Sequence, residues 1–212
     1  MCIRDRVLGR SASTVDQRQR LVSDLLVQGL QPHQAQLQFD CCEQDLQRVA
    51  AEAQGCDAVL AAGGGKVLDA GKLLAHRLSL PCITVPLSAS TCAGWTALSN
   101  IYSSQGAFEG DVALNRCPDL LVFDHGLVRL APPRTLASGV ADALAKWYEA
   151  SVSSGDSSDG LVQQAVQMAR VLRDQLLIDS LTALKDPDSE AWVRTAEACA
   201  LTAGVMLSLI HI

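Results

Sequence analysis

The chain has 212 residues, of which 49% are hydrophobic and 4% aromatic, and its formal net charge is −6. A chain of this length buries a sizeable core in one or two domains, and its acidic balance argues against nucleic-acid binding, which needs a basic face. No apolar run approaches the ~18 residues of a membrane span, and no secretory signal is recognisable. The eight cysteines form no C-x-x-C pair, so we expect reduced thiols in a cytoplasmic protein.

The two ends of the chain match a sequencing adaptor. Residues 1–6 read Met-Cys-Ile-Arg-Asp-Arg, which is encoded by the end sequence of a transposase used to fragment DNA. Residues 207–212 read Leu-Ser-Leu-Ile-His-Ile, which the reverse complement of that sequence encodes. We therefore expect 1–6 and 207–212 to be adaptor artefacts, and 7–206 to be a segment truncated at both ends. The alternative is a native N-terminus that begins Met-Cys-Ile.

Residues 7–131 alternate between strand-like and helix-like patterns. The strand-like stretches are short and either apolar or alternating, and the helix-like stretches repeat apolar residues every three or four positions. We expect strands at 35–39, 57–62, 82–85 and 119–123, helices at 16–28, 43–54 and 66–78, and a hairpin at 98–114. This alternation predicts an α/β domain with a right-handed parallel sheet and an inserted hairpin.

The strand signals stop after Pro132 and Pro133. A proline in the first turn favours the start of a helix, which we expect to reach about residue 152. Two more amphipathic stretches follow at 158–178 and 190–206. The sequence therefore predicts an α/β domain over residues 7–131, followed by an all-α domain over residues 132–206.

Three consecutive glycines, Gly63 to Gly65, stand between a predicted strand and a predicted helix. Glycine lets the backbone approach a ligand closely, and the N-terminus of a helix favours phosphate oxygens. The spacing is neither the G-x-G-x-x-G fingerprint nor a P-loop, since Val67 stands where a hydroxyl for magnesium would be needed. We predict that this turn binds a nucleotide pyrophosphate. The alternative is a tight turn without a ligand, with Lys66, Asp69 and Lys72 as solvated helix charges.

The stretch Gly-Gly-Gly-Lys-x-x-Asp-x-x-Lys at 63–72 resembles the cofactor motif of the iron-containing (group III) alcohol dehydrogenase and glycerol dehydrogenase family. The fold of that family is related to dehydroquinate synthase. Two further blocks agree with the family in order and approximate distance. They are Val-Pro-Leu-Ser-Ala-Ser-Thr at 85–91, continuing to residue 102, and Gly-Val-Ala-Asp-Ala-Leu-Ala-Lys-Trp-Tyr-Glu-Ala at 139–150.

This resemblance implies an NAD or NADP coenzyme. In the family the glycine turn binds the pyrophosphate, and the block that follows, with its hairpin, embraces the nicotinamide half. Leu87 departs from the usual Thr and offers no hydroxyl contact. The coenzyme-binding residues carried over to this chain are Gly64, Gly65, Lys66, Val67, Leu68, Asp69, Leu87, Ser90, Thr96, Leu98 and Tyr102.

The resemblance also implies a divalent metal, zinc or iron. Asp142 falls on the family's Asp that holds this metal together with two His from later helices, which leaves positions open for a substrate oxygen. A metal there polarises the reacting oxygen, so that a hydride can pass to or from the nicotinamide. Because His33, His76 and His125 all precede the later helices, we expect both His ligands in a missing C-terminal part. The alternative for Asp142 is a helix charge paired with Lys146 at i+4.

Cys92 and Trp95 are the implied substrate residues. Glycerol dehydrogenases carry an Asp where this chain has Cys92, and a thiol cannot accept the same hydrogen bonds from the substrate's hydroxyls. We therefore expect glycerol to be a poor substrate. The blocks around Cys92 and Lys146 look most like the hydroxycarboxylate dehydrogenase B-type branch, which interconverts 2-oxo and 2-hydroxy acids. Trp95 would narrow the pocket beside the nicotinamide, or it is a plain core or interface residue.

Together these features predict a metal-dependent NAD(P)-linked oxidoreductase that acts on small 2-oxo and 2-hydroxy acids or related alcohols. We expect a small-molecule substrate, no nucleic-acid or membrane partner, a homo-oligomer when full length, and an inactive fragment. The alternatives are a glycerol or polyol dehydrogenase, a non-catalytic nucleotide-binding relative, and a dehydroquinate synthase-like lyase. The lyase would need a dense basic cluster for a phosphorylated substrate, and few Lys or Arg lie near Asp142 in the sequence.

Overall fold

The computed structural model describes residues 4–9 and 14–211, and the chain divides into two compact units. Unit 1 comprises Met1–Leu87 and Ala97–Asp124, and unit 2 comprises Ser88–Thr96 and His125–Ile212. The chain therefore passes from one unit to the other three times. The predicted division near residue 131 differs from this one, because residues 88–96 belong to unit 2 and the last crossing comes directly before His125.

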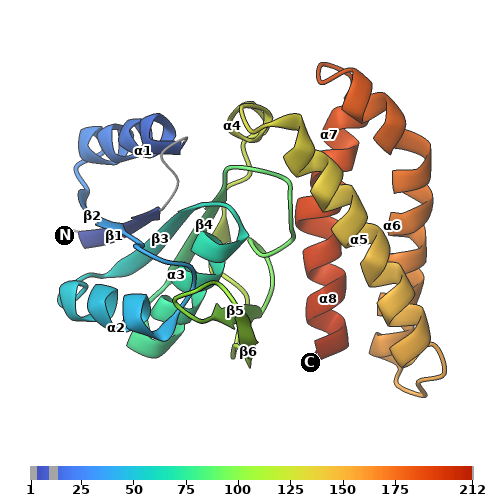
Figure 1. Ribbon diagram of the computed structural model, residues 1–212, viewed down its shortest axis with the longest axis horizontal. Helices are drawn as coiled ribbons and strands as arrows, with labels where there is room; N and C mark the ends of the chain where they lie inside the picture. Colours follow the sequence, from blue (N-terminus) through green and yellow to red (C-terminus); the bar gives the residue numbers. More distant parts are fainter. Residues whose placement is uncertain (1–3, 10–13, 212) are drawn as a thin grey trace. The chain divides into compact units, whose positions relative to one another are not determined.

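Unit 1 is built on a five-stranded sheet with the strand order β2-β1-β3-β4-β7, of which Figure 1 labels β2, β1, β3 and β4. All neighbouring strands are parallel, which confirms the predicted parallel sheet. All six residues of the central strand β3 are buried, because a parallel sheet is covered on both faces. The strands are β1 (Arg4–Gly9), β2 (Gln31–Gln36), β3 (Ala58–Gly63), β4 (Cys82–Pro86) and β7 (Leu120–Leu121).

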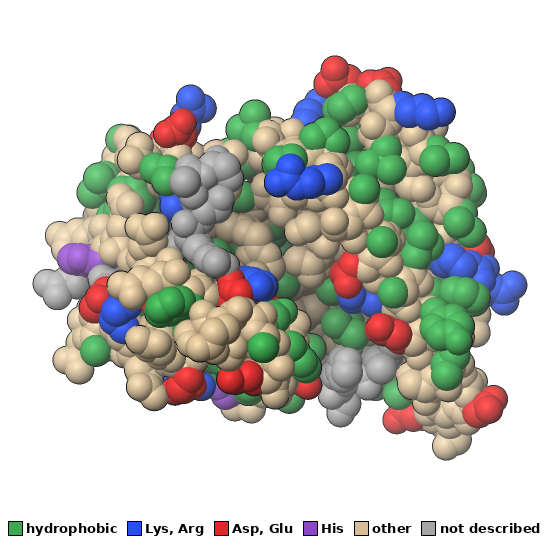
Figure 2. Space-filling view, in the orientation of Figure 1, with side chains coloured by type: hydrophobic (Ala, Val, Ile, Leu, Met, Phe, Trp, Pro, Cys, Tyr) green, Lys and Arg blue, Asp and Glu red, His purple; other side chains and the backbone are tan. Residues whose placement is uncertain are grey.

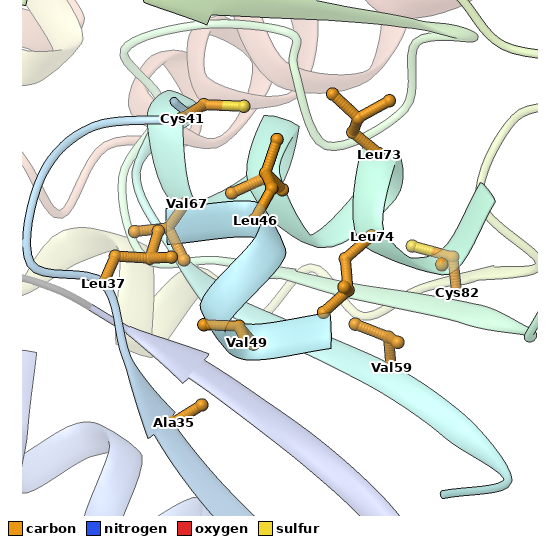
Figure 3. Packing of buried hydrophobic residues seen from close by; sticks show 12 residues of the cluster. Ala35, Leu37, Cys41, Leu46, Val49, Val59, Val67, Leu73, Leu74 and Cys82 are labelled. Carbon is orange, nitrogen blue, oxygen red and sulfur yellow. The ribbon is translucent and has the colours of Figure 1, made fainter. Parts of the chain in front are cut away.

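Three helices pack beside this sheet, α1 (Val15–Val27), α2 (Glu43–Glu52) and α3 (Gly65–Leu78). Their bounds lie within two residues of the predicted ones at either end. Figure 3 shows how apolar side chains of α2, α3 and β3 meet in one core. Burying such side chains stabilises the unit by about 25 cal/mol per Å² of apolar surface. The labelled core residues are Ala35, Leu37, Cys41, Leu46, Val49, Val59, Val67, Leu73, Leu74 and Cys82.

Some strands of unit 1 differ from the prediction. The strand predicted at 35–39 lies at Gln31–Gln36, because β2 is an edge strand whose exposed, polar residues give no apolar alternation. Leu37 is buried after that strand has ended. The strand predicted at 119–123 is reduced to Leu120–Leu121. Residues 4–6, which the adaptor hypothesis excludes from the fold, form part of β1 and pair with β2. The origin of these residues stays a prediction.

The predicted hairpin is confirmed. It consists of β5 (Leu98–Tyr102) and β6 (Phe108–Ala113), which pair antiparallel as a separate two-stranded sheet. Gly106 in the connecting turn has a φ of 85°, a conformation that glycine adopts without steric cost. The register shifts between Ile101 and Tyr102, so the end of β5 is bent where Tyr102 lies.

Residues 125–211 of unit 2 are helical. The helices are α4 (His125–Arg129), α5 (Pro133–Ser154), α6 (Gly160–Lys185), α7 (Glu190–Glu197) and α8 (Ala203–His211), and a π-helical segment η2 (Ala198–Thr202) joins α7 to α8. Pro133 occupies the first turn of α5, as predicted. Asp159 caps α6 by accepting from the backbone N–H groups of Leu161 and Val162, which stabilises a helix start.

The helices of unit 2 depart from the sequence prediction in four ways. Helix α4 was not predicted, α6 continues past residue 178 to Lys185, the stretch 190–206 is interrupted by η2, and α8 continues past residue 206 to His211, into the segment that the adaptor hypothesis excludes from the fold. Exposed apolar residues explain the second difference, because Leu177, Ile178 and Leu181 lie on the outside of α6 and blur its amphipathic pattern. Within residues 4–9 and 14–211, no helix is long and apolar enough to cross a membrane.

Candidate functional site

The glycine turn lies at the carboxyl end of β3, where the chain enters α3. Gly64 caps the helix with extended backbone angles (φ −83°, ψ −179°) and its carbonyl accepts from the N–H of Leu68 at 3.1 Å. A Cβ on Gly63 would lie 2.8 Å from Val67, whereas a Cβ on Gly64 would meet no described residue within 4 Å. The described residues therefore leave space beside Gly64, next to the positive end of a 14-residue helix, which suits an anionic ligand.

Lys66, in the first turn of α3, reaches two other segments of unit 1. Its ammonium donates a hydrogen bond to Asp40 Oδ2 and lies 4.5 Å from the centre of the Tyr102 ring. The Tyr102 backbone N–H donates to the Cys41 carbonyl at 2.8 Å. These contacts join the glycine turn to the segment before α2 and to the hairpin. Lys66 and Tyr102, which are expected to contact opposite halves of the coenzyme, therefore touch each other.

Asp69 and Lys72 of the same motif are buried, with 5% and 2% of their surfaces exposed. Lys72 Nζ lies 3.0 Å from Asp69 Oδ1 and also donates to the carbonyl of Leu98 in the hairpin. Burial raises the pKa of Asp69, against the opposing effects of Lys72 and the Asn100 N–H. The alternative that these two residues are solvated helix charges is wrong, because they hold β5 against α3. Whether Asp69 also contacts the pyrophosphate stays a prediction.

The other predicted coenzyme residues fall on both units. Val67, Leu68, Leu87 and Leu98 lie in unit 1, and Ser90 and Thr96 lie in unit 2. Val67, Leu68, Leu87 and Thr96 are buried, so their backbone atoms or packing, rather than free side chains, are available to a ligand. Ser90 Oγ lies 3.1 Å from Ser88 Oγ and is half-buried, which leaves a hydroxyl accessible in the 88–96 segment.

Asp142 lies in the middle of α5, and its two oxygens differ. Oδ1 accepts a hydrogen bond from Lys146 Nζ at 2.7 Å, one helical turn away. Oδ2 is buried and has no hydrogen-bond partner within the described residues. Burial would lower the pKa of Lys146, but Cys92 and the Asp142 carboxylate outweigh it and raise that pKa. The ammonium therefore remains charged, and Oδ2 is the oxygen left for another partner.

A divalent metal needs more ligands than Asp142 supplies. Across residues 4–9 and 14–211, no group of three His, Cys, Asp or Glu side chains is placed to hold a metal ion. His125 instead lies 3.0 Å from Glu197 and stacks edge-on against Trp192. The described residues thus fit a metal at one carboxylate oxygen only, and they do not form a complete centre.

Two buried thiols lie in the same cluster of unit 2 as Asp142 and Lys146. Cys92 and Cys199 are 2% and 0% exposed, and both interact electrostatically with Lys146. Burial, reinforced by Asp142 and Cys92, raises the pKa of Cys199 to about 12, so this thiol is uncharged at neutral pH. The sequence analysis missed Cys199. The only sequence signal was its place in a run of small residues, Ala-Cys-Ala at 198–200.

Two glycines allow the segments of this cluster to pack closely against one another. A Cβ on Gly139 of α5 would lie 1.8 Å from the Ala89 carbonyl oxygen and 3.3 Å from Cys199 Cβ. A Cβ on Gly204 of α8 would lie 3.1 Å from Trp95 Cβ. The 88–96 segment therefore packs directly against the backbones of α5 and α8, which places Cys92 and Trp95 beside these helices.

Comparison with known proteins shows the family to which the chain belongs. The model of the iron-containing alcohol dehydrogenase family matches residues 7–125, more than half of the chain. An uncharacterized oxidoreductase of Synechocystis is 54% identical over 169 residues, which cover 79% of this chain and 44% of that protein. Hydroxycarboxylate dehydrogenase A of Escherichia coli is 37% identical over 154 residues, which cover 71% of this chain and 42% of that protein.

A solved structure extends the likeness to the whole chain. The crystal structure of a probable glycerol dehydrogenase from Sinorhizobium meliloti superposes with a TM-score of 0.83 and 27% identity, over 99% of this chain and 60% of that one. The chain thus spans less than half the length of the two curated relatives. The matched family model and these similarities show that the chain belongs to the iron-containing alcohol dehydrogenase family.

Proposed function

We propose that the complete protein, of which this chain is a truncated part, is an NAD(P)-linked, metal-dependent dehydrogenase that interconverts small 2-oxo acids and 2-hydroxy acids. The observation that carries this proposal is the glycine turn. Its open space beside Gly64, the helix N-terminus and the ammonium of Lys66 suit a diphosphate. In this proposal residues 7–131 supply the coenzyme-binding residues, although residues 88–96 pack with unit 2, and residues 132–206 begin a helical part that binds the metal and the substrate.

The predicted residues would have separate roles in the reaction. The backbone from Gly64 to Asp69 would bind the diphosphate, and Leu87, Ser90, Thr96, Leu98 and Tyr102 would flank the nicotinamide. Asp142 Oδ2 would give one ligand to a divalent zinc or iron ion, and two His from beyond this chain would complete the centre. Bound together, coenzyme and metal supply hydride transfer and polarisation of the reacting oxygen. Cys92 and Trp95 would line the substrate pocket.

The substrate preference in this proposal rests on Cys92. This buried thiol lies in the same cluster of unit 2 as the Lys146–Asp142 ion pair. Cys92 offers no carboxylate oxygen to accept from two substrate hydroxyls. This favours a 2-oxo acid over glycerol.

A glycerol or polyol dehydrogenase is the second candidate, because the solved structure that matches 99% of this chain is titled a probable glycerol dehydrogenase. In both candidates we propose a small-molecule substrate, a cytoplasmic location and a homo-oligomer, without nucleic-acid or membrane partners.

The test uses the complete gene product. Calorimetry should detect binding of NAD or NADP, and a substrate panel should show faster turnover of a 2-oxo acid than of glycerol or a neutral ketone of the same size. Removal of metal with a chelator should abolish turnover, and Asp142→Asn should do the same while coenzyme binding remains. Absence of binding by either coenzyme would overturn the dehydrogenase proposal, and preferred turnover of glycerol would favour the second candidate.

A further inference from the structure

The cation at the glycine turn already has an anionic partner. Asp40 lies between β2 and α2 and is 6% exposed, and its Oδ2 accepts from the ammonium of Lys66. The Lys66 side chain itself is 42% exposed. The carboxylate is therefore fixed in the core of unit 1, while the long lysine side chain that reaches it can move at the surface.

The hairpin lies close to Asp40 at two places. The carbonyl of the neighbouring Cys41 accepts from the Tyr102 N–H at 2.8 Å, and Gly106 approaches Asp40 so closely that an added Cβ would lie 3.3 Å from its Oδ2. The hairpin thus closes over the carboxylate on the side of Tyr102, whose ring also faces the Lys66 ammonium. Lys66 rests against two groups that attract a cation, a carboxylate and an aromatic ring.

A diphosphate at the turn would compete for the same ammonium. Its charge would attract Lys66, but the fixed charge of Asp40 would attract Lys66 as well. Loss of the Lys66 contact to Asp40 would also leave this carboxylate with one charged partner fewer, which adds a modest cost because the pair is partly exposed. Both effects weaken binding of an anion at the glycine turn.

We propose that Asp40 restrains Lys66 and thereby lowers the affinity of the glycine turn for the diphosphate of a nicotinamide coenzyme. This inference rests on the proposed function. Asp40 is a positioning residue that acts on coenzyme affinity through Lys66. If Asp40 aligned Lys66 for binding, its removal would weaken coenzyme binding, whereas this proposal predicts tighter binding. Weaker coenzyme binding favours faster release of the coenzyme. Release of product limits turnover in many enzymes.

The test measures the dissociation constants of NAD and NADP by calorimetry with the complete gene product. Asp40→Asn keeps the shape of the side chain and removes its charge, and it should tighten binding about fivefold, the effect of one partly exposed ion pair. In a Lys66→Met background the same substitution should change affinity less than about twofold. Glu43→Gln is the matched control, because Glu43 pairs with Arg77 instead, and it should leave affinity unchanged.

The sign of the change separates the outcomes. Tighter binding by Asp40→Asn that depends on Lys66 supports the inference. Equal or weaker binding overturns it, while the proposed function stands as long as the unchanged protein binds coenzyme. If the unchanged protein binds neither NAD nor NADP, the proposed function fails and the inference fails with it. Asp40→Ser replaces the Asn variant if thermal unfolding shows that the latter is not folded.

Discussion

Two lysines of helix α3 each pair with an aspartate, and the two pairs serve different purposes. Lys66 in the first turn is 42% exposed and pairs with Asp40 from another segment. The side chain of Lys72, farther along the helix, is 1% exposed and pairs with Asp69 one turn away. A partly exposed ion pair contributes little to stability. Breaking a buried pair is costly, because it leaves one charge buried without its partner. One motif therefore presents a movable cation at its start and a fixed attachment for the hairpin farther along.

Breaking the buried pair should give the largest effect. Lys72→Met removes the ammonium from Asp69 and from the Leu98 carbonyl, and we expect it to lower the free energy of unfolding by about 3 kcal/mol. Denaturant unfolding followed by circular dichroism measures this loss. A double variant, Lys72→Met with Asp69→Leu, should recover part of it because no charge is then left buried. A loss below about 1 kcal/mol in the single variant would contradict the structural role.

A tight backbone approach in unit 2 should come next. Gly139→Ala would place a Cβ 1.8 Å from the Ala89 carbonyl oxygen, and the required shift of α5 or of the 88–96 segment should cost about 2 kcal/mol. Thermal unfolding of the variant measures this cost. Gly110→Ala is the control, because no described residue lies within 4 Å of its Cβ position, and it should change stability by no more than about 0.5 kcal/mol. Equal stabilities of the two variants would show that the close approach is absent.

The exposed member of the comparison should be far less costly to remove. Lys66→Met should lower the free energy of unfolding by about 1 kcal/mol or less, since its ammonium is partly solvated. Denaturant unfolding of this variant beside Lys72→Met tests the comparison directly. If both variants lost the same stability, the distinction between a movable and a fixed pair would be wrong.

The smallest effect should come from an exposed pair outside the motif. Arg77 donates two hydrogen bonds to Glu43, which lower the pKa of that carboxyl, against a smaller opposing effect of burial. A depressed folded-state pKa gives stability above the ordinary value, which is lost as the pH falls through the folded pKa. Glu43→Gln should therefore cost at most about 0.5 kcal/mol at pH 7, and the difference should shrink as the pH falls through the lowered pKa of Glu43. A difference that stays constant on acidification would exclude this ion pair as its cause.

The sequence predicted those elements whose signals are local. The apolar run of β3, the three glycines and the start of α3 are contiguous, so Gly63 to Asp69 could be placed on a strand-to-helix turn. The hairpin was predictable for the same reason, because its turn residues separate two short strands. Edge strand β2 was misplaced, since its exposed Gln31 to Gln34 carry no apolar pattern. The interruption of the last helix by η2 has no strong local sequence signal.

The candidate site shows the same limit. Asp142 and Lys146 could be paired from their i+4 spacing, and the structure has that contact at 2.7 Å. Cys199 and Asp40 were missed, because each joins its cluster across a long stretch of chain that no periodicity links. Lys66 was identified as a coenzyme residue, but its resting partner was not. Contacts between distant segments depend on packing that a single sequence does not reveal.

The route of the chain between its two units has a practical consequence for dissecting the protein. The segment Ser88–Thr96 belongs to unit 2, although unit 1 residues flank it on both sides. A gene fragment that starts at His125 would therefore lack the loop that meets Gly139 and Gly204, and its helices would expose the backbone that Ala89 and Trp95 normally cover. Expressing the helical unit alone requires grafting this loop back, for example by circular permutation.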